Sequence, residues 1–198
     1  MGNTTMTHAT QDAFGCLANK IKVASGHYLD LADPKPEMVD IVSIATALGR
    51  ICRFGGHSPD FYSVAEHSVH AHDLAYRDGL PANVCKAILL HDAAEAYIGD
   101  VVRPLKIMSP WYMEIESRIE KAIATKFDVD FKAYANIVKH YDRMMLKAEK
   151  LSMWPDDPHE WQGFDEIENV SVDFRFWRSR YASKEFCLRC IELGIELK

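Results

Sequence analysis

The chain has 198 residues, of which 48% are hydrophobic and 26% charged, and its formal net charge is -6. This composition is typical of a soluble globular protein, and the length suits one domain over residues 1–198. The acidic balance, with Lys and Arg scattered along the sequence, argues against a protein that grips long nucleic acid. No window has the roughly 18 consecutive apolar residues of a membrane span.

The N-terminus and the cysteines favour a cytoplasmic protein. The stretch MGNTTMTHAT lacks the basic flank and apolar region of a signal peptide, and Met6 stands where a myristoylation site needs Ser or Thr. Five cysteines are an odd number in a chain that is not small, so we expect reduced thiols. Cys187 and Cys190 form a C-x-x-C pair, but the sequence has no second pair to complete a zinc site.

Apolar residues recur at helical spacing through most of the chain, and no segment alternates with the period of a strand. We therefore predict an all-α fold. Asp40 is expected to cap one helix, and Ser63 and Glu66 to form a capping box at the start of another. The expected helices cover residues 11–24, 41–52, 64–77, 82–97, 110–127, 133–152 and 172–194, and 154–166 is expected to be a loop.

The stretch 88-ILLHDAAEAYIGD-100 places ionisable groups at the end of an apolar helix. His91 and Glu95 are four residues apart, so they share a face of the predicted helix, and Asp92 lies about 100° round from His91. A buried carboxylate needs a partner, either a basic side chain or a metal ion. Imidazole nitrogen and carboxylate oxygen are normal ligands for a divalent transition metal, so His91 and Asp92 are candidate ligands.

Two further candidate ligands lie elsewhere in the chain. His67 is one turn inside the helix that Ser63 begins, and Asp142 lies in a helical stretch of Tyr, Met and Leu, where an unpaired carboxylate would be unfavourable. With His91 and Asp92 they would form a two-His, two-Asp site suited to Mn²⁺, Fe²⁺, Co²⁺, Ni²⁺ or Zn²⁺. The structural alternative is that each histidine is an ordinary helix residue and each aspartate pairs with a base.

The order H…HD…D over successive helices resembles the HD-domain metal-dependent phosphohydrolases. The run 53-RFGGHSPDFYSVAEHS-68 resembles the R-[FW]…SVAEHS segment of the 5′-deoxynucleotidase-like branch. The run 91-HDAAEAYIGDVVRPLK-106 resembles the HD-[AS]-x-E-x-x-x-G-D-x-P-x-P-x-K segment of that branch, except that Val102 replaces a Pro that is common there. The resemblance covers about residues 28–152, which leaves 153–198 as a C-terminal loop and helix. It implies one helical HD-domain bundle with a central pocket and a single divalent metal ion, held by His67, His91, Asp92 and Asp142.

The resemblance also implies metal-dependent hydrolysis of a nucleotide phosphate ester. The metal would polarise the phosphate and lower the pKa of the attacking water. Glu95 would protonate the leaving 5′-oxygen or orient the water, with Asp100 assisting. Arg53 would clamp the phosphate, Lys106 would add positive charge, and Phe54 would pack against the sugar or base.

Several of these substrate-site residues have a structural alternative. Glu95 could pair with a lysine, Asp100 could cap the turn at Gly99, and Arg53 could be a surface cation. His57, in the glycine-containing loop before the His67 helix, could contact phosphate or bond only to the backbone.

The expected function is hydrolysis of the 5′-phosphate ester of deoxynucleoside monophosphates. One alternative is a triphosphohydrolase acting on a deoxynucleoside triphosphate such as dATP, which should gather more cations around the pocket. Arg50, Arg53, Arg103 and Lys106 lie near the motifs and do not decide between the two. A second alternative is a non-catalytic nucleotide-binding module, which would be expected to lack a metal ligand or the acid at Glu95.

Members of this branch often form homodimers or larger homo-oligomers, so a second copy of the chain is a candidate partner. The aromatic-rich segment 174–186 could supply an interface, or it could belong to the core. Trp111, Met144 and Met145 are expected in the core.

Overall fold

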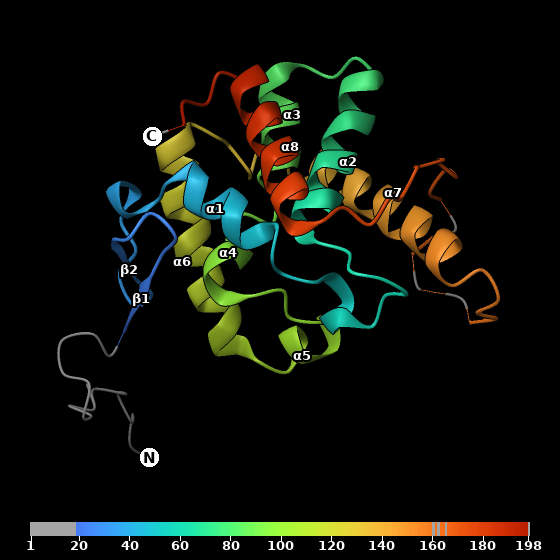
Figure 1. The fold of residues 1–198 in the computed structure, drawn as a ribbon, viewed down its shortest axis with the longest axis horizontal. Coiled ribbons are helices and arrows are strands. Elements are labelled where there is room, and N and C mark those ends of the chain that lie inside the picture. The colour runs from blue at the N-terminus through green and yellow to red at the C-terminus, as the bar shows by residue number, and fades with distance from the viewer. Residues whose placement is uncertain (1–18, 160, 162, 165, 198) are drawn as a thin grey trace.

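The computed structural model describes residues 19–159, 161, 163–164 and 166–197. Within them the chain forms eight α-helices, two 3-10 turns and one short hairpin (Figure 1), which confirms the predicted all-α class. The 3-10 turns are η2 (Pro36–Met38) and η3 (Arg53–Gly56). The helices are α1 (Ile41–Leu48), α2 (Val64–Arg77), α3 (Ala82–Leu89), α4 (Glu95–Ile98), α5 (Arg103–Ile107), α6 (Pro110–Phe127), α7 (Ala135–Met153) and α8 (Ser179–Glu192). None of these described helices is long and apolar enough to cross a membrane.

Helix α2 is the central element of the fold. Most of its residues are buried, and it packs against α3, α7 and α8 (Figure 1). Ser63 begins the helix as predicted, because its hydroxyl accepts a hydrogen bond from the Glu66 backbone N–H at 3.1 Å. Glu66 does not complete the expected capping box, since its carboxylate accepts the Trp177 backbone N–H at 2.7 Å instead.

Two groups of buried apolar side chains meet α2. One group packs α1, α4, α6 and α8 around the N-terminal half of α2, and the other packs α3 and α7 around its C-terminal half. Met144 and Met145 are buried in the second group, as expected. Trp111 was wrongly expected in the core: it is 65% exposed at the start of α6. Burying one Leu or Ile side chain stabilises a fold by roughly 1.5–3 kcal/mol, so these groups hold α2 in place.

The helix predicted over residues 11–24 is wrong for its described part, and residues 11–18 lie outside the described residues. Lys20–Lys22 form strand β1, which pairs antiparallel with β2 (Tyr28–Asp30), so that Ile21 lies opposite Leu29. Leu29 is fully buried and joins the hairpin to the core. A strand of three residues is too short for its alternation to be recognised in the sequence.

The helix predicted over residues 82–97 is divided in the structure. Helix α3 ends at Leu89, and α4 begins at Glu95 after a series of tight turns. At the break the imidazole of His91 takes the place of a backbone donor, because its Nδ1–H donates to the Ile88 carbonyl at 2.7 Å. In a continuing α-helix that carbonyl would accept the backbone N–H of Asp92. His91 and Glu95 were predicted to share one helix face, and this prediction is wrong because no regular helix joins them.

The final helix is shorter than predicted. It was expected over residues 172–194, but α8 begins only at Ser179, and 171–178 have no regular secondary structure. The Trp177 backbone N–H in this segment donates to the Glu66 carboxylate. The Phe174 ring packs edge-on against the Tyr62 ring, with their centroids 5.6 Å apart. Tertiary contacts to α2 and its preceding loop therefore override the local helical pattern.

Candidate metal centre

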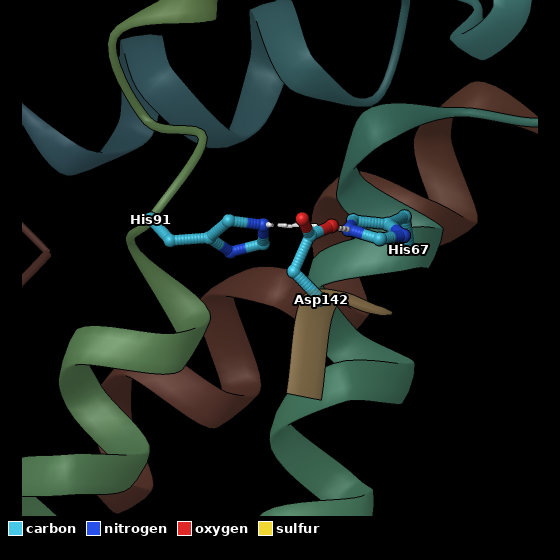
Figure 2. Close-up of side chains that lie close together, drawn as sticks. All are labelled: His67, His91 and Asp142. Carbon is cyan, nitrogen blue, oxygen red and sulfur yellow. Dashed lines mark hydrogen bonds and ion pairs between the residues drawn. The ribbon is translucent and has the colours of Figure 1, made fainter. Parts of the chain in front are cut away.

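Three side chains from three separate elements converge on one point. His67 projects from α2, His91 from the turns after α3, and Asp142 from α7 (Figure 2). The two Nε2 atoms are 3.4 Å apart, and Asp142 Oδ1 lies 3.4 Å from His67 Nε2 and 3.8 Å from His91 Nε2. Ligand atoms held about 2.1 Å from one ion lie roughly 3.0–3.4 Å apart. The group could therefore hold a metal ion with only small adjustments.

Asp92 lies at the edge of the same group. Its Oδ2 is 3.2 Å from His91 Nε2 and 3.8 Å from His67 Nε2. The four residues predicted as ligands are thus neighbours, and three of them, His67, His91 and Asp142, satisfy the geometry of a shared metal site most closely.

Hydrogen bonds fix both imidazoles with the same nitrogen facing the centre. His67 Nδ1 lies 2.6 Å from Glu149 Oε1, and His91 Nδ1 lies 2.7 Å from the Ile88 carbonyl oxygen. Both partners are acceptors, so Nδ1 donates in each ring, and Nε2 is the nitrogen that faces the centre and could bind a proton or a metal ion. An outer hydrogen bond of this kind is typical of metal-binding histidines, where it fixes the tautomer and the ring orientation.

The electrostatics of the group favour a cation. Burial raises the pKa of the Asp142 carboxyl, but its contacts with His67 and His91 outweigh this and lower it well below its usual range. The pKa of His91 is raised, because the charges of Asp92 and Asp142 overcome the effect of burial. Two ionised carboxylates beside two imidazole lone pairs bind either protons or a metal ion. Metal affinity is therefore expected to weaken as the pH falls.

Exposure increases from one side of the group to the other. The His67 side chain is fully buried, those of His91 and Asp92 are 10% and 20% exposed, and that of Asp142 is 40% exposed. The group is therefore closed around His67 and open near Asp142. An open side of this kind is characteristic of metal sites that take a water molecule or a substrate as a further ligand.

Glu149 is a residue of the site that the sequence analysis missed. It is fully buried on α7, and its carboxylate accepts hydrogen bonds from His67 Nδ1, from the Tyr62 hydroxyl at 2.8 Å and from Arg53 Nη2 at 3.1 Å. Burial raises its pKa, but the charges of Arg53 and His67 outweigh that effect and hold it at about 2. Its spacing was an available signal, because Glu149 follows Asp142 by seven residues and so lies on nearly the same helix face.

Arg53 lies inside the protein and not on its surface. Its Nη2 donates to Glu149, and its Nη1 is 3.5 Å from Asp92 Oδ2. Burial lowers the pKa of the guanidinium, but the charges of Glu149 and Asp92 raise it, so the group stays charged. Arg53 Nε is buried and has no hydrogen-bond acceptor in the described part of the chain. The structure thus places a fixed positive charge beside Asp92.

Glu95 and Lys106 form a second pair next to the group. Lys106 Nζ is 3.5 Å from Glu95 Oε1 and 2.7 Å from Glu116 Oε1 on α6. Burial and the charges of Asp92 and Asp100 raise the pKa of Glu95 well above its usual range. The other oxygen of Glu95, Oε2, is buried without a hydrogen-bond partner among the described residues. A carboxyl with a raised pKa and an unsatisfied oxygen, next to a group that could hold a metal ion, is a candidate proton donor.

The remaining predicted residues lie around the centre at different depths. Asp100 is half-buried, and burial together with the charge of Asp92 raises its pKa. Phe54 is half-buried, and its ring centroid is 5.2 Å from the Arg53 Cζ. His57 is exposed at the end of η3, and its backbone N–H donates to the Phe54 carbonyl. The structure does not bring the His57 side chain into the group.

The fold and the centre define a helical protein with a buried His/His/Asp group able to hold a metal ion. No family model matches the sequence. The chain is 35% identical over 141 residues to the uncharacterized protein YfdR of Escherichia coli strain K12, a match that covers 71% of this chain and 76% of YfdR. It is 37% identical over 111 residues to the uncharacterized protein RCAP_rcc00048 of Rhodobacter capsulatus, which covers 54% of this chain and 57% of that protein. The chain belongs to the family of YfdR.

Proposed function

We propose that the protein is a divalent-metal-dependent phosphohydrolase that removes the 5′-phosphate of deoxynucleoside monophosphates. The observation that carries the proposal is the convergence of His67 Nε2, His91 Nε2 and Asp142 Oδ1, with Arg53 and Glu95 beside them. The resemblance to HD-domain phosphohydrolases supplies the substrate class, and the side of the group near Asp142 is exposed to solvent, from which a phosphate could approach.

Four side chains would hold the metal ion in the proposed mechanism. His67, His91, Asp92 and Asp142 would hold the metal, and the two outer hydrogen bonds from Nδ1 would keep the imidazoles aimed at it. A bound divalent ion would neutralise phosphate charge and make water a better nucleophile near neutral pH.

Glu95 would act as the proton donor. Burial and the charges of Asp92 and Asp100 raise its pKa, which favours the protonated form that could transfer a proton to the leaving 5′-oxygen. Lys106 would balance the negative charge that remains, because its Nζ already lies 3.5 Å from Glu95 Oε1. Arg53 would contact the phosphate through Nη1, the nitrogen that lies on the Asp92 side.

The cations near the centre do not by themselves distinguish a monophosphate from a triphosphate substrate. Arg53 and Lys106 are already paired with carboxylates, while Arg50 and Arg103 are exposed. A triphosphate would need additional unpaired cations close to the centre.

A product assay tests the proposal. The protein would be incubated with Co²⁺ or Mn²⁺ and each deoxynucleoside mono-, di- and triphosphate, and the products would be separated by anion-exchange chromatography. Release of phosphate from monophosphates alone is the expected result. Release of tripolyphosphate from dATP would show instead that the protein is a triphosphohydrolase. Nucleotide binding without turnover would show that it is a non-catalytic binding module.

Two variants make the assay specific. Asp92→Ala should abolish turnover because it removes the carboxylate of a proposed metal ligand. Glu95→Gln should lower kcat by about 10²- to 10⁴-fold, the usual contribution of a positioned proton donor, while the Co²⁺ absorption spectrum of the protein stays unchanged. Equal activity of Glu95→Gln and the wild type would remove Glu95 from the mechanism.

A further inference from the structure

Three aromatic side chains form a half-buried cluster outside the two core groups. Phe54 lies in η3, Trp154 directly follows α7, and Trp161 lies in the loop beyond it. The Phe54 ring centroid is 5.0 Å from that of Trp154 and 6.2 Å from that of Trp161, and the two indoles are 5.8 Å apart. We call these three residues the aromatic wall.

The aromatic wall begins one side chain away from the candidate metal centre. The Phe54 ring lies 5.2 Å from the Arg53 Cζ, and Arg53 Nη1 lies 3.5 Å from Asp92 Oδ2. Nothing in the sequence predicts that Trp154 and Trp161 come close to Phe54, because about 100 residues separate them. The fold therefore brings an aromatic surface from the C-terminal loop to the side of the phosphate-binding arginine.

The structure holds the aromatic wall in place at a conformational cost. Phe54 has φ 56° and ψ 26°, a left-handed conformation that is unfavourable for a non-glycine residue. Such strain in ordered structure is concentrated at functional sites. The loop is fixed from α7, since Lys150 Nζ donates to the Asp157 carbonyl at 2.9 Å and Trp161 Nε1 donates to the Asp157 carboxylate at 3.2 Å.

The three rings of the wall are partly exposed, and Phe164 packs on Trp161 with ring centroids 6.2 Å apart. Phe54 and Trp154 meet edge-to-face, with an angle of 84° between their planes, and all three residues keep part of their surface in solvent. The only polar atom of the Trp161 side chain is already bonded to Asp157. The Trp161 side chain therefore has no spare donor with which to distinguish one base from another.

We propose that the aromatic wall stacks the base of the nucleotide whose phosphate lies at the metal centre, and that Trp154 and Trp161 set the preference for nucleotides over phosphate esters without a base. The inference rests on the proposed function and deepens it. Stacking on an aromatic side chain is tolerant of base identity, because every base has a π-face. We therefore expect discrimination between nucleotides and sugar phosphates but little discrimination among bases.

The test compares substrates with and without a base. Trp154→Leu and Trp161→Leu should each lower kcat/KM for dAMP and dCMP by about 5- to 100-fold, the range that loss of one stacking contact supports. They should leave kcat/KM for 2-deoxyribose 5-phosphate unchanged. Trp111→Leu is the matched control, because Trp111 is 65% exposed on α6 and should leave all three values unchanged. Trp161→Phe should retain most of the activity on dAMP.

Other outcomes would overturn the inference. Equal losses on dAMP and on 2-deoxyribose 5-phosphate would mean that the wall only supports the fold, and no loss on either would mean that it has no role. If the wild type hydrolyses none of these esters, the proposed function fails, and dAMP binding to the Co²⁺-loaded protein then tests the wall separately by calorimetry. Weaker binding by both Leu variants would support stacking, and unchanged binding would refute it.

Discussion

His67 and His72, both on helix α2, each form a hydrogen bond through Nδ1 to a carboxylate, yet the regions around the two histidines differ. His67 Nδ1 donates to Glu149, which also binds Arg53. His72 Nδ1 lies 2.9 Å from the carboxylate of Asp73, which binds Arg189 through two nitrogens at 2.7 and 2.9 Å. Each region thus joins one histidine, one carboxylate and one arginine, and the pKa of each carboxyl is lowered to about 2.

The difference lies in burial and in what the second ring nitrogen faces. Glu149 is fully buried, whereas the Asp73 side chain is 40% exposed. His67 Nε2 faces His91 and Asp142, while the His72 ring stacks on Tyr76 with 10° between the planes. A His–carboxylate–Arg set is therefore not in itself a functional site. It becomes part of one where the free nitrogen converges with other ligands, and near Asp73 it only ties α2 to α8.

Removal of a central ligand should give the largest effect. We expect Asp142→Asn to lower Co²⁺ affinity by more than the 10- to 100-fold that loss of an outer hydrogen-bond partner costs, because it removes a charged ligand. Turnover should be lost with the metal. Titration of the visible Co²⁺ spectrum measures the affinity, and Asp73→Asn is the control that should bind Co²⁺ normally. An Asp142→Asn protein with wild-type affinity would show that Asp142 is not a ligand.

Glu149→Gln should disturb both stability and metal binding. The variant leaves the buried guanidinium of Arg53 without its full partner, which typically costs about 3–5 kcal/mol of unfolding free energy. It also weakens the hydrogen bond that orients His67, so we expect Co²⁺ affinity to fall by about 10- to 100-fold. Urea unfolding and Co²⁺ titration measure the two effects. If only stability changes, Glu149 supports the fold without tuning the metal centre.

The sequence predicted the helical class and the neighbourhood of the metal centre better than it predicted local boundaries. Helical periodicity identified α2, α6 and α7 because these helices are long and each buries one face. At the break after α3 the Ile88 carbonyl accepts a side-chain bond from His91, which no periodicity records. Glu149 was missed for a different reason: its seven-residue spacing from Asp142 indicates the shared helix face, but only the fold shows that α7 brings it to Arg53, 96 residues away.

Acid unfolding should separate the two regions further. Glu149 has a folded pKa of about 2, below its ordinary value of 4.5, so its contribution to stability is complete above about pH 5. That contribution is lost as the pH falls through 4.5 toward 2. We expect the wild type to lose about 3 kcal/mol more unfolding free energy than Glu149→Gln between pH 5 and pH 2. Parallel losses in urea titrations at each pH would contradict this assignment.

Asp73→Asn should have the smallest effect, although the lowered pKa of Asp73 resembles that of Glu149. Solvent screens a partly exposed pair, and Arg189 keeps another partner, since its Nη1 lies 3.4 Å from Glu185 Oε2. We expect a loss of about 1 kcal/mol in unfolding free energy, with Co²⁺ affinity unchanged. The loss should shrink further in 1 M NaCl, whereas that of Glu149→Gln should not, because salt screens exposed charges far more than buried ones. Equal salt dependence would mean that burial does not separate the two regions.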